Sequence, residues 1–279
     1  MSSIVDSLTE IYVFVADYLA EHPNRAGWRR SNNGEPAFTD AEVITIGLMQ
    51  SVLRVATLKQ TYRLIANNWH ACFPKLCSYA QFVSRLHALS AVVGYLMLEA
   101  ISRHKMPGCL YLLDSKPIPV CKPIRHGRVR LLRQEGAYFG KSSTGWFFGF
   151  KLHLLVHHSG AILYALLTPG NCADKDSDVL HTLLCFGAGG AVLCDMGYQD
   201  SDLRAEIEAA YGLITIDPKQ AGQKRALISS LRERIETTNS GLWNRFVDRV
   251  FSRSFAGLWS VIKLKMLHFN LCQAGLLSA

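Results

Sequence analysis

Apolar residues in the first hundred positions recur at the spacing of an α-helix. Those of the first stretch lie on one helical face: Ile4, Leu8, Ile11, Val15 and Leu19. This helix is expected to end near residues 22–23, before a polar loop over residues 25–36. Capping-box patterns at residues 39–42 and 78–81 predict the starts of two further helices. The N-terminal third is therefore predicted to be all-α.

From residue 106 onward, short apolar runs alternate with helical stretches. Residues 110–113 predict a strand, and period-two alternation over residues 148–156 and 161–167 predicts a β-hairpin that turns at Ser159-Gly160. Helices and strands then alternate in this order: a helix that begins at Asp176-Ser177, a strand at 191–194, a helix at 203–211, a strand at 213–216 and a long helix at 226–246.

The predicted order of the second part is thus β, β, β, α, β, α, β, α. A start of three strands followed by αβαβα is the order of the ribonuclease-H-like (retroviral-integrase-like) α/β fold, a mixed sheet with helices on both faces. We therefore expect a helical N-terminal region over residues 1–105 and a ribonuclease-H-like domain with C-terminal helices over residues 106–279.

Composition and charge narrow the class of protein. The 279 residues are 49% hydrophobic and 19% charged, which is typical of globular proteins and excludes a disordered chain. Thirty Lys and Arg against 22 Asp and Glu give a net charge of +8, which favours a polyanionic partner. No run of about 18 apolar residues occurs, and the first ten residues carry acids where a secretory signal carries positive charge. The sequence predicts an intracellular protein without a membrane partner.

Two of the predicted strands end in a carboxylate. Asp114 follows residues 110–113 and Asp195 follows residues 192–194, and strand ends are where open α/β sheets bind ligands. Glu236 lies inside the last predicted helix of the sheet, where it can face the strands. Three carboxylates can hold two divalent ions about 3.5–4 Å apart for phosphodiester chemistry, and Mg²⁺ prefers such oxygen ligands. A single Asp after a strand is more often a turn or capping residue, so the expectation rests on the three acids together.

Several short stretches carry a resemblance to a known family. In chain order they are residues 112–117 (LLDSKP), 148–153 (FGFKLH), 169–171 (PGN), 194–198 (CDMGY) and 234–238 (RIETT). Together they resemble the DDE-type transposases of bacterial insertion sequences, most closely insertion-sequence family 982. The resemblance extends over roughly residues 40–275, and the order and spacing of the motifs are more specific than any one motif.

The resemblance implies a transposase that uses Mg²⁺, with Mn²⁺ as a substitute. Such an enzyme cuts DNA strands at the terminal inverted repeats of its element and transfers them into target DNA. By matching motif, Asp114, Asp195 and Glu236 would be the metal-binding catalytic triad. The expected partners are DNA and a second copy of the chain assembled on that DNA, in the bacterial cytoplasm and associated with the nucleoid.

Related enzymes carry a Tyr, Arg, Glu, Lys pattern around the last acid. Arg232 fits the arginine position, one helical turn before the glutamate. Ser229 and Trp243 stand at the tyrosine and lysine positions, so the sequence departs from the pattern there. Arg245 is the candidate substitute for the lysine.

Basic residues are concentrated in two segments that flank the three acids. Residues 116–151 hold eight Lys and Arg against one acid, and residues 219–265 hold ten against three. A solvated face is the ordinary interpretation of any one of them, whereas both clusters together favour contact with DNA phosphates. The residues expected to contact DNA are Lys116, Arg125, Arg128, Arg130, Lys141, Lys151, Arg232 and Arg245.

Other functions stay open at this stage. The helical N-terminal region is expected to serve DNA end recognition or dimerisation, and both a helix-turn-helix over residues 39–69 and a plain helical bundle fit its pattern. The alternatives for the whole protein are a ribonuclease-H-like nuclease that cuts without joining strands, and a DNA-binding protein with an inactive triad. His153 and His157 are interpreted as structural, and Asp174, Asp176 and Asp178 mainly as a helix start.

Overall fold

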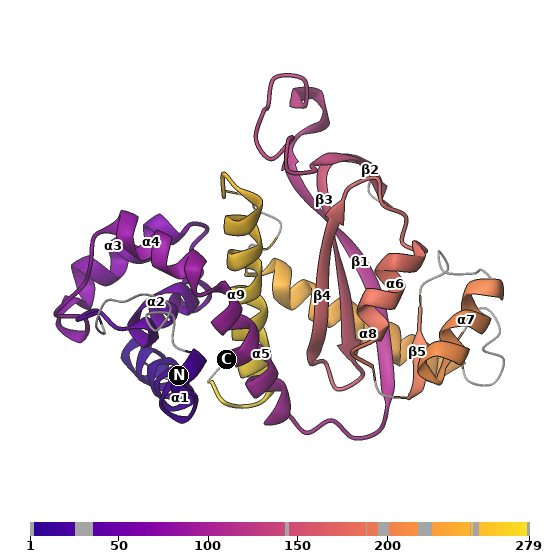
Figure 1. Cartoon of the computed structure of the whole chain (residues 1–279), viewed down its shortest axis with the longest axis horizontal. Helices are drawn as coiled ribbons and strands as arrows, with labels where there is room; N and C mark the ends of the chain where they lie inside the picture. Colours follow the sequence, from indigo (N-terminus) through magenta and orange to yellow (C-terminus); the bar gives the residue numbers. More distant parts are fainter. Residues whose placement is uncertain are drawn as a thin grey trace. The chain divides into compact units, whose positions relative to one another are not determined.

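The chain folds into two units (Figure 1). The computed structural model describes residues 3–25, 36–142, 145–187, 189–194, 201–216, 225–245, 247 and 251–277. The first unit comprises Met1–Arg103, Asn244–Val247 and Phe255–Ala279, and the second comprises His104–Trp243 and Asp248–Ser254. Within the described residues no single helix has the length and apolar composition of a membrane span. The consecutive helices Tyr79–Ala88 and Ser90–Ser102 have that length and composition only when taken together, and they are bent by 60°.

The first unit is helical. Its helices are α1 (Ile4–Glu21), α2 (Asp40–Val52), α3 (Leu58–Asn68), α4 (Tyr79–Ala88), α5 (Ser90–Ser102) and α9 (Phe255–Gln273), with short 3₁₀ turns η1 (Pro23–Arg25) and η3 (His70–Cys72). The capping boxes predicted at Thr39 and Ser78 are confirmed, since each side chain accepts from the backbone three residues on. The predicted first helix is also confirmed, and it ends at Glu21.

Helices α2 and α9 form the centre of this unit. Nearly every residue of α2 is buried, and twelve residues of α9 are buried on several sides of the helix. A helix that is covered all round lies in the interior of its unit. Figure 1 shows α9 alongside α5, and α9 also contacts α2 and α4. The sequence grouped the C-terminal helices with the sheet, whereas α9 packs with the N-terminal helices.

The second unit is built on a six-stranded mixed sheet. Its strands are β1 (Leu110–Cys121), β2 (Tyr138–Ser142), β3 (Gly145–His157), β4 (Ile162–Pro169), β5 (Gly190–Leu193) and β6 (Leu213–Ile216). The order is β2-β3-β1-β5-β6, and β4 pairs with β3 on the same edge as β2. Strand β3 is antiparallel to β1, β2 and β4, whereas β1, β5 and β6 are parallel.

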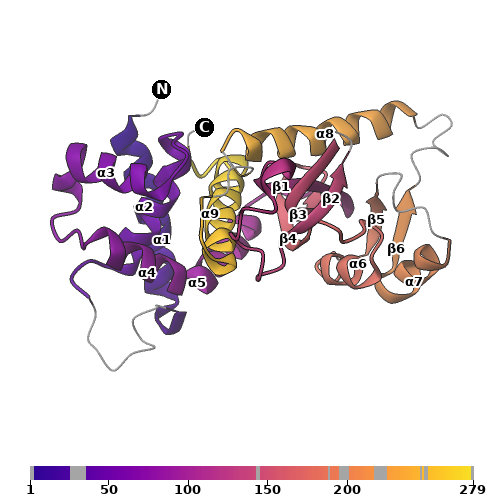
Figure 2. The same cartoon turned by 90° about the horizontal axis from the view of Figure 1, so that it is seen from above.

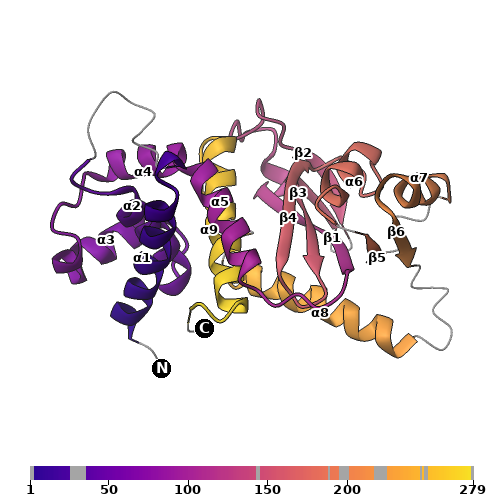
Figure 3. The same cartoon turned by 60° about the horizontal axis from the view of Figure 1, so that its bottom comes forward.

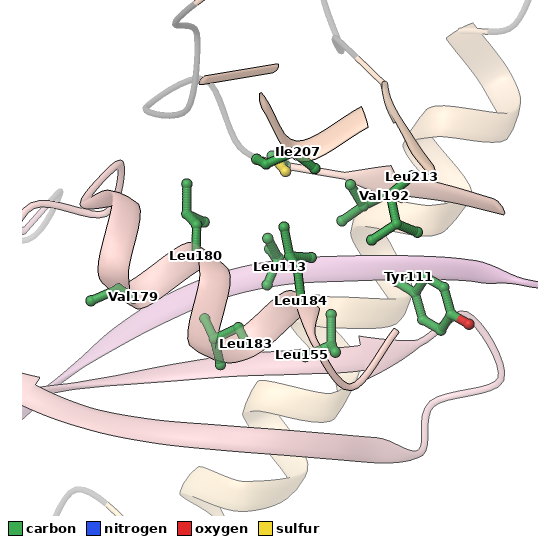
Figure 4. Close-up of a cluster of buried hydrophobic side chains, with 11 residues drawn as sticks. Tyr111, Leu113, Leu155, Val179, Leu180, Leu183, Leu184, Val192, Ile207 and Leu213 are labelled. Atoms are coloured by element: carbon green, nitrogen blue, oxygen red, sulfur yellow. The ribbon is translucent and has the colours of Figure 1, made fainter. Parts of the chain in front are cut away.

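Helices cover both faces of this sheet. They are α6 (Ser177–Leu184), α7 (Ser201–Tyr211) and α8 (Arg225–Trp243). Figures 2 and 3 show α8 along one side of the strands, with α6 and α7 on the other. Odd-numbered residues of β1, such as Tyr111 and Leu113, pack with Leu180 and Leu184 of α6 in the buried cluster drawn in Figure 4. Even-numbered residues of β1 face α8.

Two sequence predictions about strands need correction. The first strand was expected to end at Leu113, but β1 continues to Cys121, and β2 was not predicted at all. The second half of β1 was missed in the sequence because it contains polar residues and two prolines, and proline is rare in the interior of a sheet. The backbone hydrogen bonds explain why the two prolines are tolerated. The carbonyl of Leu110 accepts from His158 N, so the backbone groups of even-numbered β1 residues point toward β3. The nitrogens of Pro117 and Pro119 therefore point to the other side of β1, away from β3. There, in the described structure, β5 pairs only with residues 110–112.

Candidate functional site

Asp114 lies within β1, not at the end of a strand as predicted, on the face that α8 covers. Its Oδ1 accepts from the backbone N of Ser115 at 2.8 Å, and its Oδ2 accepts from Nδ2 of Asn239 at 2.6 Å. Lys116 Nζ lies 3.6 Å from the same Oδ2. The Asp114 side chain keeps 20% of its surface exposed, so the carboxylate is held firmly but remains reachable.

Asn239 reaches Asp114 from the buried side of α8. This side is otherwise apolar or small: Ile228, Leu231, Ile235, Thr238 and Leu242. Asn239 is 4% exposed, and its Oδ1 has no hydrogen-bond partner among the described residues. The amide orientation is fixed because an ionised carboxylate only accepts, so Nδ2 must face it. A buried polar atom without a partner costs about 1–3 kcal/mol, so this one requires an explanation.

Sequence reasoning missed Asn239. The signal was available as a polar residue within a helical stripe of apolar ones, where Leu or Ile would continue the pattern. Attention went to Glu236 because of its motif. Only the pairing of α8 with β1 shows that the residue three positions later is the one in contact with Asp114.

Glu236 and Arg232 both lie on α8 and are exposed. Glu236 stands three residues before Asn239, a spacing at which helical side chains are neighbours with Cβ atoms about 5–6 Å apart. Asp195 falls outside the described residues. Among the residues that are described, no three His, Cys, Asp or Glu side chains gather closely enough to hold a metal ion. The structure therefore places Asp114 and Glu236 and does not test the triad as a set.

The opposite face of the sheet holds a second polar group of residues. Lys151 Nζ donates to Oδ1 of Asp174 at 3.1 Å and to the carbonyl of Cys172 at 2.8 Å. The Ser115 hydroxyl donates to the same carboxylate oxygen at 2.7 Å. Lys151, which the sequence expected on DNA, is only 12% exposed and forms an internal ion pair on the face opposite Asp114. These bonds tie the segment after β4 to β1, directly beside the candidate site.

The remaining basic residues of the first segment are exposed. They surround η4 (Pro123–Arg125) and β2 and are Lys122, Arg125, Arg128, Arg130, Arg133 and Lys141. The Lys141 ammonium lies 6.0 Å from the ring centroid of Trp146, whose side chain is 64% exposed. Exposed cations next to an exposed aromatic ring are suited to a nucleic-acid backbone and its bases.

His153, His157 and Asp176, which the sequence predicts to be structural, have hydrogen-bond partners within the protein. His153 Nε2 lies 2.8 Å from the Thr168 hydroxyl, and burial lowers the pKa of His153 to about 4. His157 contacts the Ser159 hydroxyl and the carbonyl of Gly108. Asp176 accepts from Val179 N and caps α6, which confirms its interpretation as a helix start.

Arg245 lies in the helical unit, where Nε donates to Nδ1 of His268 at 3.0 Å. Its guanidinium also lies over the ring of Phe269. Burial, and then the charge of Arg245, lower the pKa of His268 to about 3. The sequence expected Arg245 on DNA, and the structure gives it a partner on α9.

This arrangement predicts acid sensitivity of the helical unit. Below pH 6.5 His268 becomes protonated in the unfolded chain, whereas in the folded unit it stays neutral down to about pH 3. The free energy of unfolding therefore falls by about 1.4 kcal/mol for each unit by which the pH is lowered between these two values. Above pH 6.5 the residue has no such effect. Urea unfolding at pH 7.5 and 4.5 should show that acidification lowers the free energy of unfolding of His268→Gln by about 3 kcal/mol less than that of the wild type. Equal losses would contradict the assignment.

Comparison with known proteins identifies the sheet unit. Residues 104–246, slightly more than half of the chain, match a family model described as the transposase DDE domain. Neither the curated proteins nor the solved structures yielded a match.

Proposed function

The chain belongs to the transposase DDE-domain family, whose members are enzymes that act on DNA; from this premise we propose that it cuts DNA strands at the terminal inverted repeats of its element and transfers them into target DNA. The observation that carries the proposal is the Asp114 carboxylate, held by two hydrogen bonds on the sheet face beneath α8. A carboxylate fixed in this way can hold a cation beside a phosphodiester.

The proposed fold of the second unit is ribonuclease-H-like. Support comes from the path β4-β3-β1-β5-β6, in which an antiparallel start is followed by parallel strands, and from helices on both faces. A further support is the register of the parallel pair. Leu112 pairs with Leu193, and Asp114 and Asp195 each follow two residues later in the sequence. Within the family, we assign the chain to insertion-sequence family 982 on its motifs.

The oxygen atoms of Asp114 and of two residues of α8 are of the type that a hard divalent ion prefers. Asp114 and Glu236 provide carboxylate oxygens, and Asn239 has a buried carbonyl oxygen that lacks a partner among the described residues. We propose that Asp114, Asp195 and Glu236 hold Mg²⁺, with Mn²⁺ as a substitute. When bound, divalent ions activate the attacking oxygen and stabilise the leaving oxygen of a phosphodiester.

The basic residues have separate tasks in this proposal. Lys116 stands beside the Asp114 carboxylate with a 39% exposed side chain, where it can bind the phosphate that is cut. Arg232, exposed one turn before Glu236, orients the same phosphate. Arg125, Arg128 and Arg130, with Lys141, bind the DNA backbone farther along.

The partners follow from the same chemistry. Two DNA ends must be brought together before they are joined to one target, so we propose a homodimer that assembles on DNA. The net charge of +8 supports binding to the nucleoid of a bacterial cytoplasm. The helical unit is proposed to recognise the DNA ends or to hold the second copy.

A strand-transfer assay tests the proposal. Purified protein is incubated with Mg²⁺ or Mn²⁺, labelled DNA that carries the inverted repeats flanking its own gene, and an unlabelled target plasmid. Cleavage at the repeat boundary together with joined products supports the transposase. Cleavage without joining would indicate the nuclease, and a salt-sensitive mobility shift without cleavage would indicate the inactive DNA-binding protein.

A further inference from the structure

We propose that Asn239 is a positioning residue of the metal site and acts through Asp114. Its amide N–H, 2.6 Å from Oδ2, fixes the rotation of the carboxylate. Together with the backbone N of Ser115 on Oδ1, it gives each carboxylate oxygen one donor. The role assigned to Asn239 rests on the proposed metal-dependent function.

An amide suits this position because it orients a carboxylate without neutralising it. An ionised carboxylate has about four acceptor sites, and the bonds from Ser115 N and Asn239 occupy one site on each oxygen. A lysine or arginine in place of Asn239 would hold the carboxylate equally well, but it would compete with a cation for the charge. Asn239 therefore adds no positive charge to the one that Lys116 already brings within 3.6 Å of Oδ2.

Packing alone does not account for Asn239. Its side chain is 4% exposed among apolar residues such as Ile235 and Leu242, and its Oδ1 has no partner in the described structure. A leucine, which branches at the same atom, would continue the apolar stripe and would leave no buried side-chain oxygen unpaired. An asparagine is thus unfavourable for the apolar packing of α8 but favourable for the hydrogen bond to the Asp114 carboxylate. Its unpaired Oδ1 also leaves an oxygen donor on the same side chain.

Mn²⁺ binding to the full-length protein without DNA tests this role. Titration followed by the electron paramagnetic resonance signal of free Mn²⁺ should show affinity about tenfold weaker in Asn239→Leu than in the wild type, as is usual when a group that orients a metal ligand is removed. Thr238→Val is the matched control, because Thr238 is the neighbouring buried polar residue of α8. This control should bind Mn²⁺ like the wild type.

A second variant covers the case in which Asn239→Leu does not fold. Asn239→Asp places two carboxylates together, so its melting temperature should fall in EDTA and recover with saturating Mn²⁺ by more than that of Thr238→Val. A structural residue remote from the ion would give the same loss in both conditions. Wild-type affinity in Asn239→Leu, or no metal-dependent recovery in Asn239→Asp, would overturn the role of Asn239.

Asp114→Asn separates this role from the proposed function. If Asp114→Asn abolishes Mn²⁺ binding while Asn239→Leu leaves it unchanged, the metal site stands and the role of Asn239 falls. If the wild type binds no Mn²⁺, or Asp114→Asn binds it as the wild type does, the metal site itself falls, and the role of Asn239 with it.

Discussion

Asp114→Asn is expected to lower the rate of DNA strand cleavage by about a thousandfold, which corresponds to roughly 4 kcal/mol of lost transition-state stabilisation. The substitution removes a charge that a metal ion needs and keeps the shape of the side chain. The carbonyl oxygen of the new amide can still accept one of the two hydrogen bonds, from Asn239 or from the backbone N of Ser115, but its NH₂ group leaves the other donor unpaired. The free energy of unfolding should therefore fall by about 1–3 kcal/mol. Single-turnover cleavage and urea unfolding measure the two effects.

Glu236→Gln should give a loss of cleavage on the same scale, again with intact DNA binding. Glu236 is exposed on α8, so its substitution should not disturb the packing of that helix against the sheet. Glu208→Gln is the matched control, since Glu208 is an exposed glutamate on α7. If the affinity of Glu236→Gln for DNA falls as much as its cleavage rate does, Glu236 has a structural role instead.

Gly149→Ala is expected to destabilise the sheet unit by about 3 kcal/mol, because backbone occupies the space that its Cβ would need. A Cβ on Gly149 would overlap the carbonyl oxygen of Ile118 and lie 2.8 Å from the amide nitrogen of Val120. The Gly149 carbonyl also accepts from Gly170 N at 3.0 Å, so the FGFK and PGN motifs meet here. Urea unfolding, followed by circular dichroism, measures the change.

Gly127→Ala is the control for this substitution. Gly127 follows η4 in the same unit, and a Cβ there meets no other atom within 4 Å. Its stability should change by less than about 0.5 kcal/mol. If Gly149→Ala were as stable as Gly127→Ala, β1 and β3 would have to move apart at Gly149 with no loss of stability, which would contradict the prediction. The register that carries Asp114 would then be more adaptable than we infer.

Periodicity predicted most of this fold, because most of its elements have one clearly apolar face. The hairpin of β3 and β4, the helix capped at Asp176 and the parallel strands β5 and β6 all lie close to their predicted ranges. The second half of β1 and strand β2 were missed because their residues do not alternate clearly. Pro117 and Pro119 are acceptable only at an open edge, and no sequence pattern reports which edge is open.

In the candidate site too, some residues could be predicted from the sequence and others could not. Asp114 was found from its position after an apolar run, although the reason was partly wrong, since β1 continues beyond it. Asn239 stands out in the sequence as a polar residue in an apolar stripe, but its contact with Asp114 could not be predicted, because it depends on which turn of α8 packs against β1. The contacts of Lys151 with Asp174 and of Arg245 with His268 were also out of reach, because each joins residues that only the fold brings together.

The placement of α9 has a consequence for the order in which the chain folds during synthesis. Most of the helical unit precedes the sheet unit in the sequence, but its central helix comes from residues 255–273, which follow the sheet unit. The whole sheet unit is therefore translated before the helical unit receives the twelve buried residues of α9. Domains usually fold in the order in which they are translated. Of the two units, the one that is started first is completed last. A chain truncated before residue 255 therefore lacks the central helix of the helical unit.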